Sequence, residues 1–292
     1  MPRPWAPREV SPLSPTVDLH IHSIHSDGVL SPVQIVDRAV ALRLTAISIT
    51  DHDTVAGIGP LIDAARDRIE VIPAVEMSST LDHLDIHILG YYIDHRIDGL
   101  RTYLEKYRQF RDERARKIIR NLSVDGVVID YGQVLTLAHN GSLGRPHLAE
   151  ALLQNGYVHS ISEAFARYLG YQSPYYEPKM NISPREVMGI IRQSGGIPVI
   201  AHPANLLSTG LIYQLIMDGA GGIEVWHPEH NRRQEQEIHE LAIKNGLAMT
   251  GGSDYHGYQS GSEIGQRGCR DEDVKILKRH CPSLSSTTRR LS

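Results

Sequence analysis

Short apolar runs alternate with amphipathic segments along most of this 292-residue chain. The runs are rich in valine, isoleucine and leucine, which is typical of buried strands, whereas the segments between them have helical periodicity. The predicted strands are Val17–Ile21, Leu44–Thr50, Ile69–Val75, Asp85–Tyr92, Ile197–Ala201, Gly222–Trp226 and Leu247–Thr250. This alternation predicts an α/β fold of about seven strand–helix units around a parallel sheet, either open or closed into a barrel.

Capping signals mark the ends of several predicted helices. Ser31-Pro32 and Ser183-Pro184 each begin a helix, because the serine can cap it and proline fits its first turn. Asn245-Gly246 is a typical helix stop. Further helices are expected at Gly59–Arg68, Leu211–Met217 and Gln234–Lys244.

The alternation is interrupted in the middle of the chain, where Leu100–Leu122 reads as a long charged helix with no strand after it. We therefore predict a helical insertion within the barrel, and terminal segments that lack its pattern. The predicted parts are an N-terminal arm at 1–16, a discontinuous barrel domain at 17–96 and 180–282, a helical insertion subdomain at 97–179, and a frayed tail at 283–292.

Histidine and carboxylate residues gather where the predicted strands end. The groups are His20-x-His22 with Asp27, Asp51-His52-Asp53, Glu76, His87, His202-Pro203, and Asp254-x-His256. The strand ends of a barrel surround a single site, so these groups favour a barrel over an open sheet. Imidazole and carboxylate ligands together suit Mn, Zn and Fe and, more weakly, Mg, so we interpret the set as a multi-metal hydrolase site. Structural histidines are the alternative, above all for His87 inside its strand.

Composition narrows the possible environments. The formal net charge is −4, so the surface as a whole does not indicate binding of long nucleic acids. No apolar run is long enough to span a membrane. The two cysteines, Cys269 and Cys281, lie far from the histidine groups and form neither a disulfide framework nor a zinc knuckle. A reducing, cytoplasmic location is therefore the expectation.

The motifs resemble those of the PHP family, named for polymerase and histidinol phosphatase domains. The matching segments are Asp18–Ser23, Ser26–Gly28, Ile49–Asp53, Val75–Ser78, Ile86–Gly90, Ala201–Pro203 and Gly252–His256. The resemblance implies a distorted seven-stranded, TIM-like (β/α)7 barrel with a mainly helical insertion, and two or three divalent ions, with Mn preferred and Zn, Fe or Mg possible. It implies three ion sites: the first with His20, His22, Glu76 and Asp254; the second with Glu76 as bridge, His87 and His202; the third with Asp27, His52 and His256.

Within that family the chain resembles small phosphoesterases that remove the 3′-phosphate from 3′,5′-bisphosphonucleotides, some of which also trim short 5′-phosphorylated RNA. Gly144-Arg145-Pro146-His147 and Tyr175–Lys179 carry this closer likeness. It implies that Arg145, His147 and Lys179 contact substrate phosphate. A surface or capping role is the alternative for Arg145, and a place at a helix N-terminus is the alternative for His147.

The expected chemistry is attack on phosphorus by a hydroxide held between the ions that Glu76 bridges. His202 or His256 could donate a proton to the leaving group. The basic residues of Arg101–Arg120 form either a solvated helix face or an electrostatic guide for RNA, with Arg108, Arg111 and Arg114 as the test positions. Two alternatives stay open: a phosphomonoesterase for a non-nucleotide such as histidinol phosphate, and a metal-dependent binding module without turnover. No obligate protein partner is expected.

Overall fold

The computed structural model describes residues 15–139, 141–257 and 261–281, and its strands form two sheets. The first sheet has the order β1-β2-β3, with β1 at Val17–Ile21, β2 at Ala46–Ile49 and β3 at Glu70–Val71. The second has the order β4-β5-β6-β7-β8, with β4 at Ala74–Leu81, β5 at Leu84–Tyr91, β6 at Ile197–Ile200, β7 at Gly222–Trp226 and β8 at Ala248–Gly251.

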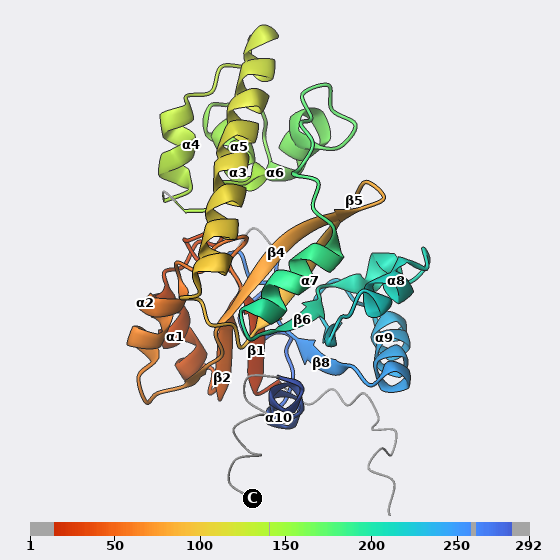
Figure 1. Ribbon diagram of the computed structural model, residues 1–292. Helices are drawn as coiled ribbons and strands as arrows, with labels where there is room; N and C mark the ends of the chain where they lie inside the picture. Colours follow the sequence, from red (N-terminus) through yellow and green to blue (C-terminus); the bar gives the residue numbers. More distant parts are fainter. Residues whose placement is uncertain (1–14, 140, 258–260, 282–292) are drawn as a thin grey trace, which may run out of the picture.

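Helices surround these sheets and form the upper part of the molecule in Figure 1. Their bounds are α1 Pro32–Ala41, α2 Ile58–Ala65, α3 Asp98–Val124, α4 Tyr131–Leu137, α5 Arg145–Gln154, α6 Ile161–Ala164, the π-helix η1 Phe165–Leu169, α7 Pro184–Gln193, the 3-10 helix η2 Pro203–Leu206, α8 Leu211–Met217, α9 Arg232–Asn245 and α10 Asp271–His280. The two Ser-Pro signals are confirmed, because the side chains of Ser31 and Ser183 accept hydrogen bonds from backbone N–H groups in the first turns of α1 and α7.

The prediction of uniform parallel strand–helix units is wrong in the middle of the sheet. β4 and β5 form an antiparallel hairpin, and β5 also runs antiparallel to β6. The hairpin turns at Asp82 and His83, whose φ angles of 48° and 66° are typical of a tight two-residue turn. The remaining pairs, β1–β2, β2–β3, β6–β7 and β7–β8, are parallel, as predicted.

Over the described residues, the strands do not close into one continuous barrel. Isolated bridges connect the two sheets instead, one between His52 and Glu76 and one between Ile21 and Tyr255. The α/β class is therefore confirmed, and the closed barrel is not. These two bridges bring segments of the first sheet that carry histidines beside segments of the second sheet that carry histidines and carboxylates.

The helical insertion has its own apolar core. Buried side chains of α3, α4, α5 and η1 pack together, among them Leu122, Val134, Leu148, Leu152 and Tyr168. The long helix α3 connects the insertion to the rest of the molecule (Figure 1). Its first half contributes Leu100, Leu104 and Tyr107 to the core around α7 and the β4–β5 hairpin. All elements from 98 to 169 are helical, in keeping with the predicted insertion, while the domain boundaries themselves stay a prediction.

Three further expectations concern the chain termini, the cysteines and membrane-spanning segments. Residues 1–14 of the predicted arm and the whole predicted tail, 283–292, lie outside the described residues. Cys269 and Cys281 are both buried. Among the described residues, no helix is long and apolar enough to cross a membrane.

Candidate metal centre

The carboxylate of Glu76 lies at the middle of a group of imidazoles. It comes from β4, is 1% exposed, and each of its two oxygens faces histidines from different strands or strand ends. The ring nitrogens around Oε2 are His52 Nδ1 at 3.0 Å, His22 Nε2 at 3.2 Å and His20 Nε2 at 3.5 Å; those around Oε1 are His87 Nδ1 at 2.9 Å and His202 Nε2 at 3.1 Å. Glu76 is thus placed to connect two sets of donors.

Asp254 is a second carboxylate of the centre. Its Oδ1 lies 3.2 Å from Nε2 of both His20 and His22, which share one face of β1 because they are two residues apart. Asp254 has a φ of 49°, and its N–H donates to the carbonyl of His20. This backbone contact holds the segment after β8 beside β1.

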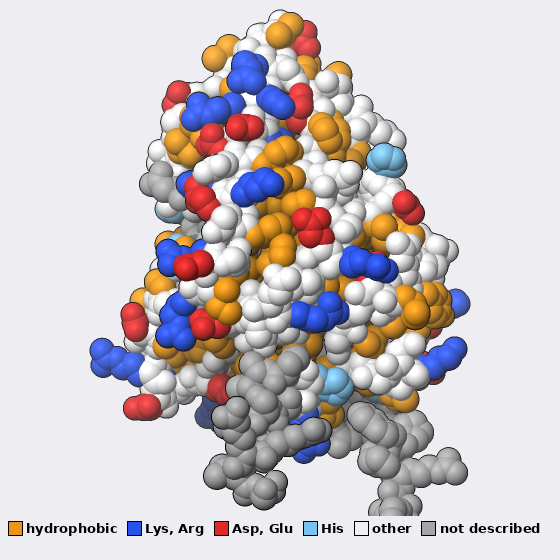
Figure 2. All heavy atoms as spheres, in the orientation of Figure 1, with side chains coloured by type: hydrophobic (Ala, Val, Ile, Leu, Met, Phe, Trp, Pro, Cys, Tyr) orange, Lys and Arg blue, Asp and Glu red, His pale blue; other side chains and the backbone are white. Residues whose placement is uncertain are grey.

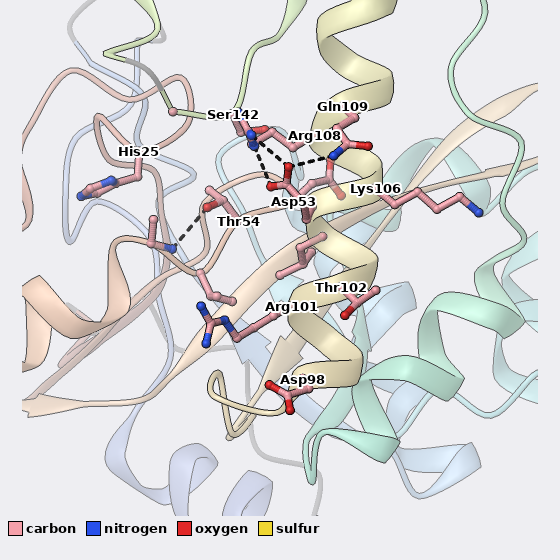
Figure 3. A pocket seen from close by; sticks show the side chains of 15 residues that line it. His25, Asp53, Thr54, Asp98, Arg101, Thr102, Lys106, Arg108, Gln109 and Ser142 are labelled. Carbon is pink, nitrogen blue, oxygen red and sulfur yellow. Dashed lines mark hydrogen bonds and ion pairs between the residues drawn. The ribbon is translucent and has the colours of Figure 1, made fainter.

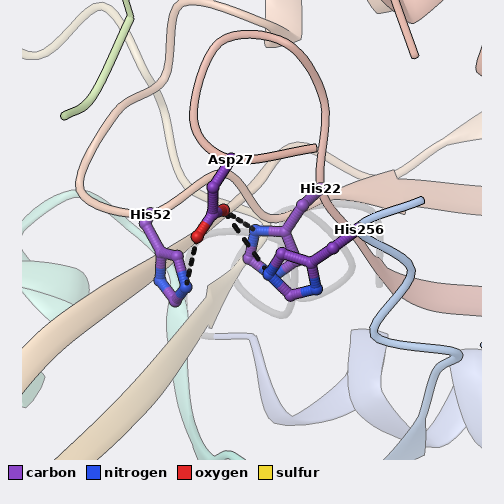
Figure 4. A group of neighbouring side chains, drawn as sticks. All are labelled: His22, Asp27, His52 and His256. Carbon is purple, nitrogen blue, oxygen red and sulfur yellow. Dashed lines mark ion pairs between the residues drawn. The ribbon is translucent and has the colours of Figure 1, made fainter. Parts of the chain in front are cut away.

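Asp27 is the third carboxylate (Figure 4). Its oxygens lie 3.4 Å from His256 Nε2, 3.7 Å from His22 Nδ1 and 3.8 Å from His52 Nε2. The loop that carries Asp27 is fixed by Asp51, which accepts hydrogen bonds from the backbone and hydroxyl of Ser23 and from the hydroxyl of Ser26. Asp51 therefore shapes the loop and does not face the other carboxylates.

The charge balance of this centre depends on its burial. Burial by itself would raise the pKa of Glu76, yet the imidazoles of His52, His87 and His20 hold that pKa well below its usual range. Burial would also raise the pKa values of Asp27 and Asp254, but neighbouring histidines have the larger effect and hold both pKa values well below the ordinary one. Three ionised carboxylates in one buried site need cations beside them.

The donor atoms fit divalent metal ions. Within the described residues, many of the buried nitrogen and oxygen atoms that lack a hydrogen-bond partner belong to this centre: His20 Nε2, His22 Nε2, Asp27 Oδ1, His52 Nδ1, Glu76 Oε2 and both nitrogens of His87. Buried polar atoms are normally satisfied, so these atoms are suited to coordinate metal ions. Three sets of donor atoms within 4.8 Å of one another are His22–Asp27–His52–His256, His20–His22–Asp254 and His52–Glu76–His87. Such nitrogen and oxygen donors suit Mn, Zn and Fe.

All nine predicted ligands come together at this centre, although not in three separate sets. His22 turns Nε2 toward Glu76 and Asp254 and Nδ1 toward Asp27. His52 likewise lies between Glu76 and Asp27. The partition of these residues among individual ions therefore stays a prediction.

Three residues next to the centre, two of them buried and one partly buried, are absent from the set that the sequence predicts. Glu224 contacts His20, His227 contacts Asp254, and Arg111 pairs with Asp53 next to His52. Glu224 has the same signal as Glu76, an acid inside an apolar strand. His227 follows a strand, but nothing else in its sequence context separates it from a surface histidine. Arg111 carries no local signal, because only the fold reveals that this position of α3 points inward.

Of the predicted substrate residues, Lys179 and Arg145 converge on one carboxylate near the centre. Lys179 Nζ lies 2.9 Å and Arg145 Nη2 3.4 Å from Asp85 Oδ2, and all three side chains are less than 20% exposed. Tyr171 donates its hydroxyl to the same oxygen. Neither cation is a simple surface residue.

The third predicted substrate residue, His147, has no ring nitrogen left for substrate. Its Nδ1 accepts the N–H of Gly144 at 3.0 Å, and its Nε2 lies 3.0 Å from the carbonyl of Ser26, to which it can donate. The side chain is buried. His147 therefore connects the start of α5 to the loop of Asp27, and its interpretation as a phosphate contact is wrong for this arrangement.

The interpretation of the basic residues on α3 as a solvated face is wrong at two of the three test positions. Arg111 donates to Asp53, and Arg114 is buried and donates to the carbonyl of Glu177, so neither belongs to a solvated face. A groove of about 920 Å³ does run beside α3 (Figure 3), but its charges balance. Its charged lining residues are Arg101, Lys106 and Arg108 against Asp53, Asp98 and Glu105. On the face in Figure 2, basic and acidic side chains are interspersed. These observations do not favour an RNA guide here.

An α/β fold with several buried imidazoles and carboxylates at its strand ends is typical of a metal-dependent enzyme. The PHP domain profile matches residues 18–249, and the chain belongs to the PHP domain family. It is 35% identical to a 5′-3′ exoribonuclease of Haemophilus influenzae over 82% of this chain and 89% of that protein. It is 32% identical to a 3′,5′-nucleoside bisphosphate phosphatase of Chromobacterium violaceum over 85% of this chain and 90% of that protein.

A solved protein from Bifidobacterium adolescentis superposes with a TM-score of 0.86 and 29% identity, over 94% of this chain and all of that one. Family membership and the donor set together support metal-dependent phosphoester hydrolysis as the class of reaction. The identity of the metal is left open by the same donors, which accept several ions.

Proposed function

We propose that the protein removes the 3′-phosphate from 3′,5′-bisphosphonucleotides, such as 3′,5′-bisphosphoadenosine, with divalent ions bound at the Glu76 centre. The observation that carries this proposal is a cationic cluster beside that centre, made of Lys179, Arg145 and Arg114. A simple monoester needs only one place for phosphate, whereas a bisphosphate needs a second one at a fixed distance. The similarity to the Chromobacterium phosphatase supports the same assignment.

The cationic cluster contains more positive than negative charge. Lys179 and Arg145 share the carboxylate of Asp85. Arg114 adds a third cation, whose Nη2 is buried and finds no hydrogen-bond partner in the part of the chain that the structure describes. Burial lowers the pKa of Arg114, and the neighbouring Arg145 lowers it further. A phosphate dianion would relieve this repulsion, and guanidinium groups bind its oxygens in pairs.

Asp85 acts in the cationic cluster as a stand-in for phosphate. One of its oxygens receives the ammonium of Lys179, the guanidinium of Arg145 and the hydroxyl of Tyr171, as a phosphoryl oxygen would. Burial would raise the pKa of Asp85, but Lys179 and the Tyr171 hydroxyl lower it, so the carboxylate is ionised at neutral pH. It therefore keeps the cations in place before substrate arrives.

The cationic cluster and the metal centre meet on one strand. Asp85 and His87 are two residues apart on β5, so their side chains leave the same face about 7 Å apart. His87 contacts Glu76, and Asp85 contacts Lys179. A nucleotide with phosphates on both the 5′ and 3′ positions can bridge these two places, so both phosphates would be recognised together.

Bound divalent ions would lower the pKa of a water molecule to give a nucleophile at neutral pH and would neutralise phosphoryl oxygens. The chain's own residues hold and orient the substrate: Glu76 and its histidines define the reacting end, and Lys179 and Arg145 define the other. We do not assign His202 or His256 as the proton donor to the leaving group, because each directs its Nε2 toward a carboxylate.

A substrate panel tests the assignment. Purified protein loaded with Mn²⁺ is given 3′,5′-bisphosphoadenosine, adenosine monophosphate and histidinol phosphate, and phosphate release is measured. We expect kcat/KM to be highest for the bisphosphate. Comparable turnover of histidinol phosphate would reject the nucleotide assignment in favour of a general phosphomonoesterase. Absence of turnover on all three would favour the binding-module alternative.

Variants of the cationic cluster test the second-phosphate site. A hydrogen bond to a charged group contributes about 1.5–3 kcal/mol, which is roughly a 10- to 150-fold effect. Lys179→Met should therefore reduce kcat/KM for the bisphosphate by about that factor and leave a simple monoester nearly unaffected. Arg233→Met is the matched control, because that exposed arginine pairs only with Glu237 on α9 among the described residues. Equal losses on both substrates would contradict a phosphate subsite.

A 5′-to-3′ exonuclease activity on short RNA is the second candidate, favoured by the similarity to the Haemophilus exoribonuclease. In this case Lys179 and Arg145 would hold the 5′-phosphate and the metal centre the next phosphodiester. A pair of short RNAs, one with a 5′-phosphate and one with a 5′-hydroxyl, distinguishes the cases. Faster trimming of the phosphorylated RNA, lost in Lys179→Met, is the expected result; equal rates on both would contradict it.

A further inference from the structure

His227 is a buried histidine that contacts the metal centre from outside. It follows β7 directly and is 1% exposed. Its Nε2 lies 3.3 Å from Asp254 Oδ2, the carboxylate oxygen that faces away from His20 and His22. The His227 ring lies 5.3 Å from that of His202 and 6.0 Å from that of His20 between centroids. Within the described residues this Nε2 is a buried atom without a hydrogen-bond partner, so its position alone allows either a metal ligand or a group that orients a ligand.

A backbone contact distinguishes these two roles. Nδ1 of His227 accepts the N–H of Glu229 at 3.2 Å. An amide N–H always donates, so Nδ1 must carry the lone pair, and the proton of the neutral ring is then on Nε2. A protonated nitrogen cannot bind a metal ion but can donate to Asp254. The buried set His20–Glu224–His227, whose atoms are close enough for an ion, is therefore not a further metal site in this tautomer.

Glu224, on β7, orients His20 in a similar way. Its Oε1 lies 3.0 Å from His20 Nδ1, and its Oε2 accepts the N–H of His202 at 2.8 Å. A ring nitrogen beside a carboxylate donates to it, so Nδ1 of His20 is held by Glu224, and Nε2 is left as the atom that would bind a metal ion beside Glu76 and Asp254. Glu224 on β7 and His227 just after it thus set the orientation of one imidazole and one carboxylate of the centre.

We propose that His227 is a positioning residue, which donates its Nε2–H to Asp254 so that the opposite carboxylate oxygen is presented to a metal ion shared with His20 and His22. Outer groups of this kind fix the orientation and basicity of metal ligands and commonly change metal affinity 10- to 100-fold when they are removed. The inference rests on the metal-dependent part of the proposed function and not on the identity of the substrate.

Nuclear magnetic resonance of the wild-type protein tests the tautomer directly. Protein labelled with ¹⁵N in histidine is loaded with Zn²⁺, which is diamagnetic, and long-range ¹H–¹⁵N correlations identify the protonated nitrogen of each ring. We expect His227 to keep its proton on Nε2 after loading. A metal-bound Nε2, or a proton on Nδ1, would overturn the proposal. Because this measurement needs no variant, it remains decisive if a substitution prevents folding.

Two substitutions test the positioning role. Glutamine can place an amide N–H near the position of Nε2, so His227→Gln should bind Mn²⁺ within about threefold of wild type, measured by calorimetric titration of metal-free protein. His227→Leu lacks a donor and should lose about 10- to 100-fold in affinity. His239→Leu, on the partly exposed side of α9, is the control and should be unchanged. Wild-type affinity in His227→Leu, or equal losses in both His227 variants, would overturn the proposal.

These readouts separate the positioning role from the proposed function. Metal affinity and tautomer do not depend on which phosphoester is cleaved, so a failed substrate panel leaves them valid. Conversely, intact activity on bisphosphates combined with unchanged metal binding in His227→Leu rejects only the positioning role.

Discussion

Replacing Arg111 with methionine should destabilise the protein strongly, although Arg111 belongs to a helix that reads as solvated in sequence. Its guanidinium donates to Asp53 Oδ2 through Nε at 2.9 Å and Nη2 at 2.5 Å, to Ser78 Oγ at 3.1 Å and to the carbonyl of Leu143 at 3.1 Å. The Asp53 side chain is fully buried. Methionine would fill most of the volume of the arginine stem but would leave the Asp53 carboxylate without its cation.

The size of the expected loss of stability depends on the hydrogen bonds that Asp53 keeps in the variant. Breaking a buried ion pair by removing one partner costs about 3–5 kcal/mol. Asp53 still accepts hydrogen bonds from the backbone and hydroxyl of Ser78, at 2.8 and 2.9 Å, so we expect the lower end, about 3 kcal/mol. In Asp53→Asn combined with Arg111→Met, the amide can satisfy both Ser78 groups without a charge. The double variant should therefore recover about 2 kcal/mol of that loss.

Urea unfolding of metal-free protein measures these values, because bound metal would add its own stabilisation. Arg108→Met is the control on the same helix, since that exposed arginine pairs with Glu105 and should contribute less than about 0.5 kcal/mol. A cost below about 1 kcal/mol for Arg111→Met, or strict additivity of the two substitutions, would show that the pair does not anchor α3 to the metal-bearing loop.

Three further substitutions give separate tests. Glu76→Gln should weaken Mn²⁺ binding by more than about 100-fold, which exceeds the usual effect of losing a residue that only contacts a metal ligand. A full Mn²⁺ content by atomic absorption would show that Glu76 does not bind the metal. Burial lowers the pKa of His147 despite the nearby Asp27. As pH falls below about 6.5, the unfolded state therefore takes up this proton before the folded state does, and the free energy of unfolding decreases. His147→Asn should remove that part of the slope, at most about 1.4 kcal/mol per pH unit, in urea midpoints taken from pH 7.5 to 5; an unchanged slope would refute it. His83→Gly should stabilise the hairpin by about 0.5 kcal/mol, because His83 has a φ of 66°, and a lower thermal midpoint would contradict this.

Local signals predicted most elements because each depends on neighbouring residues. The caps at Ser31 and Ser183 and the stop at Gly246 require only a few adjacent positions, and all three lie where expected. The run from Ile69 to Val75, however, divides into β3 and β4, since Pro73 has no N–H for a ladder. The antiparallel direction of β4 and β5 depends on a turn of two non-glycine residues, which the sequence alone does not mark clearly.

The site was predictable to the extent that its residues stand at strand ends. A histidine or carboxylate at the end of a buried apolar run needs a polar partner, so the groups of candidate residues stood out in the sequence. The resemblance to the PHP family then selected nine of them as ligands, and these nine meet in the structure. What each atom faces could not be predicted. His147 shows this most clearly, because both of its nitrogens contact backbone groups and one of these, the carbonyl of Ser26, is 121 positions away in the sequence.

The triplet Asp51-His52-Asp53 shows why the insertion matters to the centre. Three adjacent polar residues could all be ligands by sequence, yet each faces a different partner: Asp51 the loop of Asp27, His52 the other carboxylates, and Asp53 the Arg111 guanidinium. The same insertion carries Arg145, whose guanidinium belongs to the cationic cluster. One part of the chain therefore fixes the loop of His52 and, under the proposed function, supplies charge for the second phosphate. Loss of Arg111 should then affect metal binding, whereas loss of Arg145 should affect substrate choice.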